Sequence, residues 1–283
     1  VTRILRVKMR SGLFDTPPAA SALNGRSEAV NNEADRALAR RAVRESLVLL
    51  KNNRALPMGN EKKILVVGKA AVGFDSQVGG WSMTWQGAEN TPADFPNAED
   101  FLTAARKAVG EAGKVDYSAD AANVDVRGYD AVIAVIGEPP YAEMKGDIAY
   151  PESLQHTDRY PEDLALLKAV SGKGVPVTTI LYSGRPVYAN DLINLSDAFV
   201  AAWLPGTQAA GITDVLIRPK AAAAPAIDFR GRLPFDWPLA ACPQPHRKSA
   251  NLPRGFGLTY AKPKRVHSLP VEPAPKGCEA PAG

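Results

Sequence analysis

Apolar residues occur in four short, unbroken runs in the central part of the chain. The runs lie at 64–67, 131–136, 177–181 and 198–203. Unbroken apolar runs of this length are typical of strands that are buried on both faces of a sheet. Patterns with helical spacing separate them, at 98–112, 161–171 and 206–217, and a weaker strand-like run lies at 115–117. This alternation predicts an α/β fold: a doubly wound, mostly parallel sheet sandwich.

The segments on either side of this core predict how the chain is organised. Residues 1–15 show a helical pattern, and residues 16–32, rich in Pro, Ala, Ser and Asn, are expected to form a linker. A strong amphipathic helix is expected over 33–52. It opens a folded domain over 33–261. The last residues, 262–283, are proline-rich and lack apolar periodicity, which predicts a disordered tail or a truncated further domain.

Prolines change the character of the chain after residue 218. Pro219 and Pro225 enclose a run of alanines and end the last helical pattern. The segment that follows, 228–238, has extended pieces on both sides of Gly231. It predicts a late hairpin or an edge strand.

Charge and cysteine content narrow the function classes. The 34 basic and 30 acidic residues give a net charge of +4 without a basic stripe, so nucleic-acid binding is not expected. No run approaches the roughly 20 apolar residues of a membrane span. The first residues lack the pattern of a secretory signal, so any such signal is expected upstream of Val1. Cys242 and Cys278 have no metal-ligand spacing around them, which argues against zinc and leaves the redox compartment open.

The loop after the first predicted strand contains two indoles close together. Trp81 and Trp85 stand in GGWSMTWQG at 79–87. In parallel α/β sheets, ligands bind beyond the carboxyl ends of the strands, where this loop is expected. A flat indole suits the apolar face of a sugar ring, while its N–H can reach a polar partner. The alternative is that both rings pack in the core of the domain.

The loop after the second predicted strand is rich in charged groups. The segment 137–147, GEPPYAEMKGD, carries Glu138, Glu143, Lys145 and Asp147. A carboxylic acid in this position is able to protonate a leaving oxygen if burial or a neighbouring carboxylate raises its pKa, whereas Lys145 would act in the opposite direction. An acidic loop is, however, more often solvated surface.

Three further sequence features give little support to other kinds of chemistry. The segment 68–73 superficially resembles a phosphate loop but lacks the Gly-Lys-Ser/Thr sequence, so a nucleotide site is disfavoured. The SGRP sequence at 183–186 predicts a turn in which Arg185 bonds backbone carbonyls. The three histidines lie apart and no GxSxG motif occurs, so a Ser-His-Asp hydrolase is not supported.

Seven motifs in order resemble the C-terminal half of glycoside hydrolase family 3, most closely its β-glucosidases and exo-acting β-glucan glucohydrolases. They are ESLVLLKN at 45–52, GGWSMTWQG at 79–87, GEPPYAEMKGD at 137–147, SGRPV at 183–187, AAWLPG at 201–206, GRLPFDWP at 231–238 and GFGLTY at 255–260. Residues 1–15 also resemble the end of the family's N-terminal barrel. The segment before GRLP departs from the family pattern, so the resemblance gives no expectation for the local fold at 218–228.

The resemblance implies a retaining enzyme that hydrolyses terminal β-linked glucose in β-glucans or oligosaccharides. The N-terminal barrel domain of such an enzyme carries the nucleophilic Asp and is the expected partner, so this chain alone is expected to be inactive. The acid/base maps onto Glu143, the clamp on the outgoing sugar onto Trp85, and Trp81 shapes the same loop. No metal or cofactor is expected, since two carboxyl groups do the chemistry. A periplasmic or secreted location is expected. The alternative is a non-catalytic carbohydrate-binding or interaction module.

Overall fold

The computed structural model describes the chain except for residues 27–28, 150, 220–226, 243–251, 272–277 and 279–283. The chain divides into two units, 1–39 and 40–283. Unit 1 contains helix α1 (Thr2–Arg10), the short 3-10 turn η1 (Pro18–Ala20) and the beginning of helix α2 (Glu33–Ser46), which continues into unit 2. No helix in the described parts of the chain is both long and apolar enough to span a membrane.

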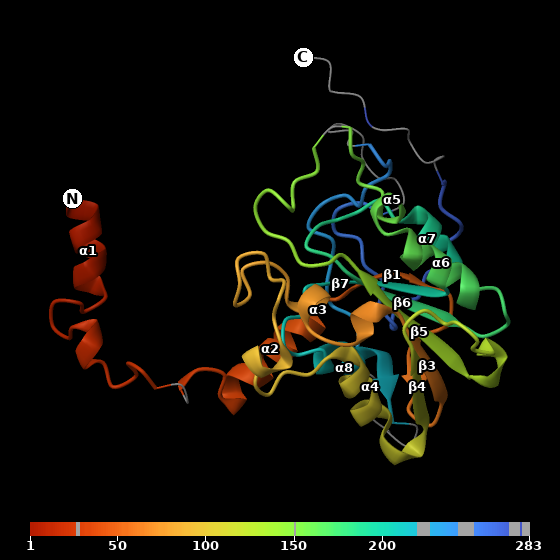
Figure 1. Cartoon of the computed structure of the whole chain (residues 1–283), viewed down its shortest axis with the longest axis horizontal. Coiled ribbons are helices and arrows are strands. Elements are labelled where there is room, and N and C mark those ends of the chain that lie inside the picture. Colours follow the sequence, from red (N-terminus) through yellow and green to blue (C-terminus); the bar gives the residue numbers. More distant parts are fainter. Residues whose placement is uncertain (27–28, 150, 220–226, 243–251, 272–277, 279–283) are drawn as a thin grey trace. The chain divides into compact units, whose positions relative to one another are not determined.

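A six-stranded sheet forms the centre of unit 2 (Figure 1). Its order is β1-β7-β6-β5-β3-β4, in which β1 runs antiparallel to β7 and all other neighbours are parallel. The strands are β1 (Val48–Asn52), β3 (Lys63–Val67), β4 (Lys114–Ser118), β5 (Ala131–Gly137), β6 (Val177–Tyr182) and β7 (Ala198–Trp203). The four predicted strands are confirmed, and the weaker run at 115–117 is the edge strand β4. A separate pair joins β2 (Met58–Gly59) to β8 (Ile217–Arg218).

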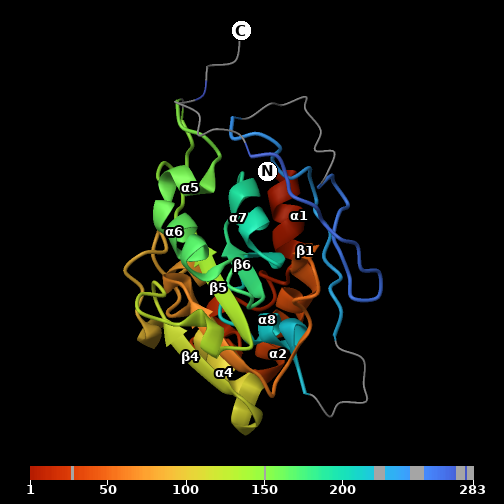
Figure 2. The same cartoon turned by 90° about the vertical axis from the view of Figure 1, so that its right-hand side faces the viewer.

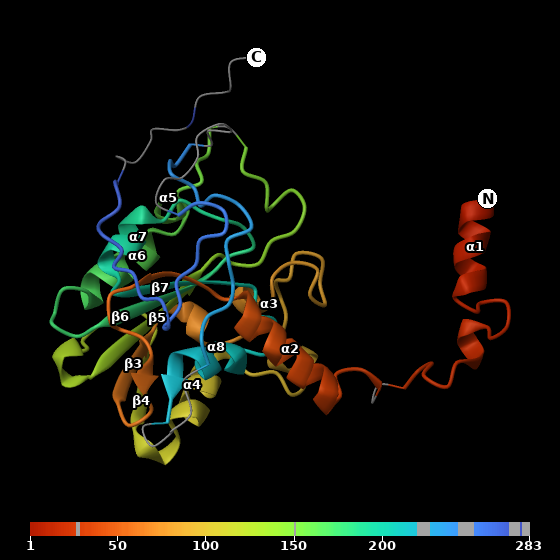
Figure 3. The ribbon, with the colours of Figure 1, turned by 180° about the vertical axis from the view of Figure 1, so that it is seen from behind.

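Helices cover both faces of the sheet, as Figures 1 and 3 show from opposite sides. They are α3 (Asp75–Val78), α4 (Phe101–Val109), α5 (His156–Arg159), α6 (Pro161–Val170), α7 (Asn190–Leu195) and α8 (Ala210–Leu216), with short turns η3 (Lys69–Ala71), η4 (Pro92–Asp94), η5 (Gly110–Ala112) and η6 (Val126–Gly128). On β5, Ile133 and Val135 pack with α4 and α8, whereas Val132 and Ala134 pack with α6 and α7. Helices α6 and α7 lie side by side on that second face (Figure 2). Burial on both faces explains the unbroken apolar runs, and the predicted α/β sandwich is confirmed.

The helix predicted over 33–52 is wrong in its last third. Helix α2 ends at Ser46, and 48–52 form strand β1 at the edge of the sheet, paired with β7. Val48 and Leu50 contact one core and Leu49 the other. A short apolar run fits both helical and strand spacing, and here the available sheet edge decides the outcome.

The segment 228–238 forms no strand of the described sheets, contrary to the expected hairpin or edge strand. It still bonds the later segment 252–256: the backbone N–H of Leu233 donates to the carbonyl of Phe256 at 2.8 Å, and that of Trp237 donates to Leu252 at 2.9 Å. Pro234 and other prolines of these segments have no N–H to donate, which interrupts a regular ladder.

The proline-rich segment 262–283 was expected to be a disordered tail or a truncated further domain, and its first part packs on the domain. Asn194 donates its amide to the carbonyl of Leu269 and accepts from the same residue's N–H, at 2.9 and 2.8 Å, and Leu269 is buried. Cys278 forms a disulfide with Cys242. The other residues of 272–283 lie outside the described part of the chain. The sequence did not predict this pairing.

Candidate active-site half

The order of the strands reverses between β3 and β5. From β3 the chain moves to β4 on one side and then returns to β5 on the other side of β3. The segments that follow the carboxyl ends of β3 and β5 therefore diverge, which is where open α/β sheets bind ligands. The candidate loops 79–87 and 137–147 both belong to these segments.

The two indoles of loop 79–87 are exposed on unit 2. Trp81 is 66% and Trp85 46% exposed, and their ring centroids lie 6.3 Å apart at an interplanar angle of 47°. The backbone N–H of Trp81 donates to the backbone carbonyl of Trp85 at 3.0 Å. Asn90 further fixes the loop by donating to the carbonyls of Ser82 and Gly87. The alternative of core packing is therefore wrong within this domain, because the loop is held by its own polar bonds while its rings face outward.

Glu143 stands on a tight turn that holds its side chain outside the domain. The N–H of Gly146 donates to the carbonyl of Ala142 at 2.8 Å, and the N–H of Asp147 donates to that of Met144 at 3.0 Å. Glu143, Met144 and Asp147 are exposed. Among the described residues, no ion pair joins Glu143 to the neighbouring lysine or to any other cation.

The two loops are joined directly at Trp85 and Glu143. The Trp85 Nε1–H donates to Oε2 of Glu143 at 3.2 Å. Gln86 holds the backbone on both sides of the carboxylate, because its amide donates to the carbonyl of Glu143 at 3.1 Å and its oxygen accepts from the N–H of Ala142 at 2.8 Å. A Cβ on Gly80 would lie 2.1 Å from the carbonyl oxygen of Tyr141, so only glycine permits this approach. The structure thus brings together Trp81, Trp85 and Glu143.

The other glutamate of the loop, Glu138, is buried beneath the turn. It is 2% exposed, and its carboxylate accepts hydrogen bonds from Tyr141 at 2.8 Å, from Ser183 and from the guanidinium of Arg159. Arg185 does not bond carbonyls as predicted; its Nε–H donates to the Tyr141 hydroxyl at 2.7 Å. Burial, and then the charge of Glu138, raise the pKa of Tyr141.

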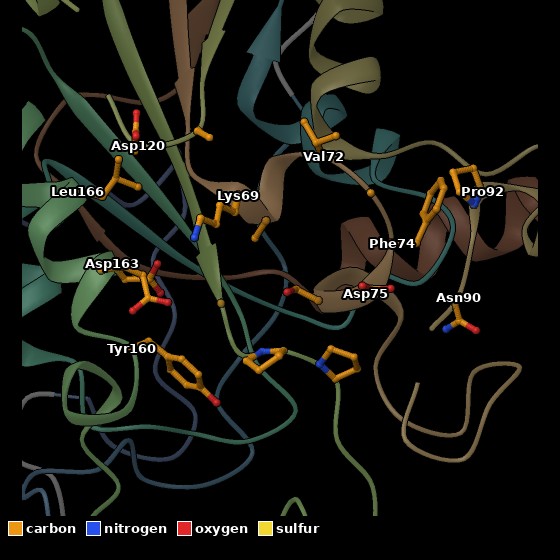
Figure 4. Close-up of a pocket in the computed structure, with 18 of the residues that line it drawn as sticks. Lys69, Val72, Phe74, Asp75, Asn90, Pro92, Asp120, Tyr160, Asp163 and Leu166 are labelled. Atoms are coloured by element: carbon orange, nitrogen blue, oxygen red, sulfur yellow. The ribbon is translucent and has the colours of Figure 1, made fainter. Parts of the chain in front are cut away.

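A cavity of 710 Å³ lies beside these loops, at the carboxyl ends of β3, β4 and β5. Figure 4 shows Lys69, Tyr160 and Asp163 directed into it from one side and Phe74 from the other. Burial raises the pKa of Asp163, and the 2.6 Å contact with His156 opposes that rise. Glu143 and the two exposed indoles do not line this cavity. Four carboxylates line it against one lysine, namely Asp75, Asp120, Glu162 and Asp163, which disfavours the phosphate ligand that segment 68–73 superficially suggests.

No cluster suited to a metal ion occurs in the described ranges: nowhere in them do three or more His, Cys, Asp or Glu side chains gather as ligands. The two exposed loops present one carboxyl group, one indole that donates to it and a second indole beside them. Such a surface is able to bind a flat, hydroxylated ring and exchange one proton with it.

Gln86 and the partners of Glu138 are the functional candidates that sequence reasoning missed. Gln86 follows Trp85 within a quoted motif, so its position was a usable signal. Arg185 was noticed but interpreted as a turn residue. Arg159 carries no local signal, because only the fold brings it to Glu138.

Comparison with known proteins gives a consistent result. Residues 47–262 match the family model described as "Glycosyl hydrolase family 3 C-terminal domain". The lysosomal beta glucosidase of Dictyostelium discoideum is 31% identical over 92% of this chain and 34% of its own length. The periplasmic beta-glucosidase of Salmonella typhimurium is 28% identical over 83% of this chain and 33% of its own length.

A solved structure has a similar fold. A mutant of the exo-1,3/1,4-beta-glucanase from a Pseudoalteromonas species superposes with a TM-score of 0.87 and 39% identity, over 96% of this chain and 44% of that chain. The chain therefore spans about a third of the length of the two curated relatives and less than half of this solved structure.

Proposed function

The chain belongs to glycoside hydrolase family 3, and its residues 47–262 match the C-terminal domain of the enzymes of that family. From this premise we propose that the chain supplies the acid/base half of a retaining, exo-acting β-glucosidase. The hydrogen bond from Trp85 to Glu143 is the observation that carries this proposal. It joins a proton-transfer group and a sugar-binding ring from two separate loops on one exposed edge of the domain. The other wall of the active site, with the nucleophile, comes from an N-terminal barrel domain.

The proposed reaction hydrolyses a terminal β-linked glucose in two steps. An Asp of the barrel attacks the anomeric carbon, and the C–O bond to the leaving group breaks as Glu143 gives its proton to the departing oxygen. In the second step Glu143 takes a proton from water, whose oxygen attacks the same carbon and releases the Asp. Both steps invert the anomeric carbon, so the β configuration is retained. The two carboxyl groups are expected about 5–5.5 Å apart.

Trp85 has two roles in this proposal. Its indole face holds the outgoing sugar, and its N–H restricts the Glu143 carboxylate to one orientation. Trp81 supports the loop from its neighbouring position. Because both rings are exposed on this domain, a partner surface or a substrate is expected to cover them.

A non-catalytic carbohydrate-binding module is the second candidate, and the pair of exposed indoles is the feature that favours it. The two functions differ in what Glu143 must do. A binding module needs the rings but no proton transfer.

The deciding experiment joins this chain to a family 3 barrel domain and compares aryl β-glucosides that differ in leaving-group basicity. Glu143→Gln is expected to lower kcat/KM by about 10³-fold for a glucoside with a poor leaving group. The loss should be much smaller for a dinitrophenyl glucoside, because dinitrophenolate departs without a proton. Glu111→Gln, an exposed substitution on η5, is the matched control and should change nothing. If Glu143→Gln turns over all substrates like the unsubstituted protein, the catalytic assignment fails and the binding module is favoured.

We also propose a periplasmic or secreted location. The Cys242–Cys278 disulfide supports it, because such bonds persist in oxidising compartments, and one relative is a periplasmic enzyme. Protein taken from cells and alkylated without reduction should contain no free thiol. Two labelled cysteines would contradict the proposed location.

A further inference from the structure

Glu138 is a buried carboxylate whose hydrogen-bond partners come from its own loop and from distant segments. Tyr141 and Ser183 donate to Oε2, and the Arg159 guanidinium donates to Oε1. The Arg185 Nε lies 3.8 Å from Oε2. A carboxylate with 1% side-chain exposure is stable only when charges and donors replace water in this way.

These partners come from the loop itself, from helix α5 and from the segment after β6. Arg159 ends helix α5, whereas Ser183 and Arg185 follow the carboxyl end of β6. The backbone N–H of Glu138 donates to the carbonyl of Tyr182, the last residue of β6. Glu138 therefore fastens the beginning of loop 137–147 to rigid elements on both sides.

Tyr141 carries this attachment towards Glu143. Its hydroxyl donates to Glu138 and accepts from Arg185, and the Arg185 guanidinium lies 4.1 Å from the centre of its ring. The ring also fills the space beside Gly146, where a Cβ would lie 2.6 Å from its Cδ2. Tyr141 thus contacts both ends of the turn that presents Glu143: it directly precedes Ala142 in sequence, and its ring packs beside Gly146.

We propose that Glu138, Tyr141 and Arg185 are positioning residues that hold Glu143 at the place where proton transfer occurs. This inference rests on the proposed function of Glu143. None of the three residues touches the substrate; they act by fixing the backbone at 141–146. Gln86 fixes the same backbone from loop 79–87. A displacement of about 1 Å in such a group lowers a rate by about 10²-fold.

The test variant is Tyr141→Phe in the chain joined to a family 3 barrel domain. It removes the hydroxyl that bridges Glu138 and Arg185 and retains the ring. For an aryl glucoside with a poor leaving group, kcat should fall about 10- to 100-fold with KM little changed. For a dinitrophenyl glucoside, whose leaving group needs no proton, kcat/KM reports the first step alone and should change by less than about 3-fold.

Tyr129→Phe is the matched control. Its hydroxyl also donates to a carboxylate, that of Asp116, at 3.1 Å, but it precedes the amino end of β5, away from the loop. It should leave both substrates unaffected. Arg185→Lys is a second test variant, because it keeps the charge but loses the planar donor to Tyr141, and it should show the same selectivity for poor leaving groups.

The outcomes separate this inference from the proposed function. An equal loss on both substrates in Tyr141→Phe and Arg185→Lys, or no loss in either, overturns the positioning role even if Glu143→Gln behaves as proposed. If Glu143→Gln itself shows no preference between leaving groups, the proposed function fails first. A change of the alkaline limb of the pH profile of kcat/KM in Tyr141→Phe would further support positioning, since that limb reports the catalytic acid.

Discussion

Two glutamates five positions apart in one loop have opposite environments. Glu138 is 2% exposed and bonded to Tyr141, Ser183 and Arg159, whereas Glu143 is exposed and accepts a side-chain hydrogen bond from Trp85. The inner half of the loop, 137–141, is therefore anchored, and the outer half, 142–147, is presented. The role of a carboxylate thus follows from its surroundings rather than from its place in a motif.

The comparison also explains why one loop can be both precise and accessible. Anchors on β6 and α5 hold the inner half, and the short turn needs no apolar burial of its own. Reactive groups work best on supports whose own positions are fixed by packing and hydrogen bonds.

Replacing each of the two glutamates by alanine should lower the free energy of unfolding by very different amounts. Glu138→Ala leaves buried guanidinium and hydroxyl groups without their acceptor and should lower the free energy of unfolding by about 3 kcal/mol. Glu143→Ala, on the exposed turn, should change it by less than about 0.5 kcal/mol. Urea denaturation of the chain measures both. Equal effects would remove the distinction between an anchored and a presented half.

Reducing the disulfide should destabilise the far side of the loop. Cys278 donates its N–H to the carbonyl of Pro151 at 2.7 Å, and the carbonyl of Ala241, beside Cys242, accepts from the N–H of Leu154 at 2.7 Å, so the bond fastens the chain shortly after the turn. With a sequence separation of 36 between the cysteines, reduction should cost about 3 kcal/mol. Urea denaturation with and without dithiothreitol tests this. Unchanged stability would show that the disulfide does not hold this side.

Trp85→Phe should affect the presented half alone. It retains an aromatic ring but removes the N–H that donates to Glu143, a loss of about 1 kcal/mol or roughly 5-fold in kcat/KM. Kinetics with the joined barrel domain measure the loss, and urea denaturation should show no accompanying change in stability. A large fall in stability would mean that the indole belongs to the core after all.

Alkaline pH should act on the anchored half. Because the pKa of Tyr141 is raised above its ordinary value in the folded chain, its contribution to stability is present below about pH 10 and is lost as the pH rises through the folded value. Tyr141→Phe should therefore show a slightly shallower fall of unfolding free energy above about pH 10. Other tyrosines with raised pKa values keep part of the fall in the variant. A steeper fall would contradict the direction of the shift.

Much of the framework was predictable because it depends on local pattern. Runs such as 131–136 are apolar on both sides, which is typical of a strand covered on both faces, and strand ends then locate the loops. The motif resemblance singled out Glu143, Trp85 and Trp81, and the fold brings them to one edge. Their catalytic roles stay predictions.

The remainder depends on contacts between distant parts of the chain. Strand β1 has a sequence that also fits a helix, and its pairing with β7, about 150 residues later in sequence, decides its structure. Arg159 and Arg185 meet Glu138 only in the folded sheet, so the sequence offered no reason to couple them. The Cys242–Cys278 pair could not be inferred from spacing alone.

Rescue by azide of Glu143→Ala, in the chain joined to a family 3 barrel domain, tests the role of this carboxyl group most directly. The small anion is expected to enter the space left by the side chain and attack the glucosyl-enzyme that forms from a dinitrophenyl β-glucoside. Our proposal predicts faster turnover with added azide and β-glucosyl azide as the product. A turnover rate that does not change with added azide, or glucose as the only sugar product, would contradict Glu143 as the acid/base.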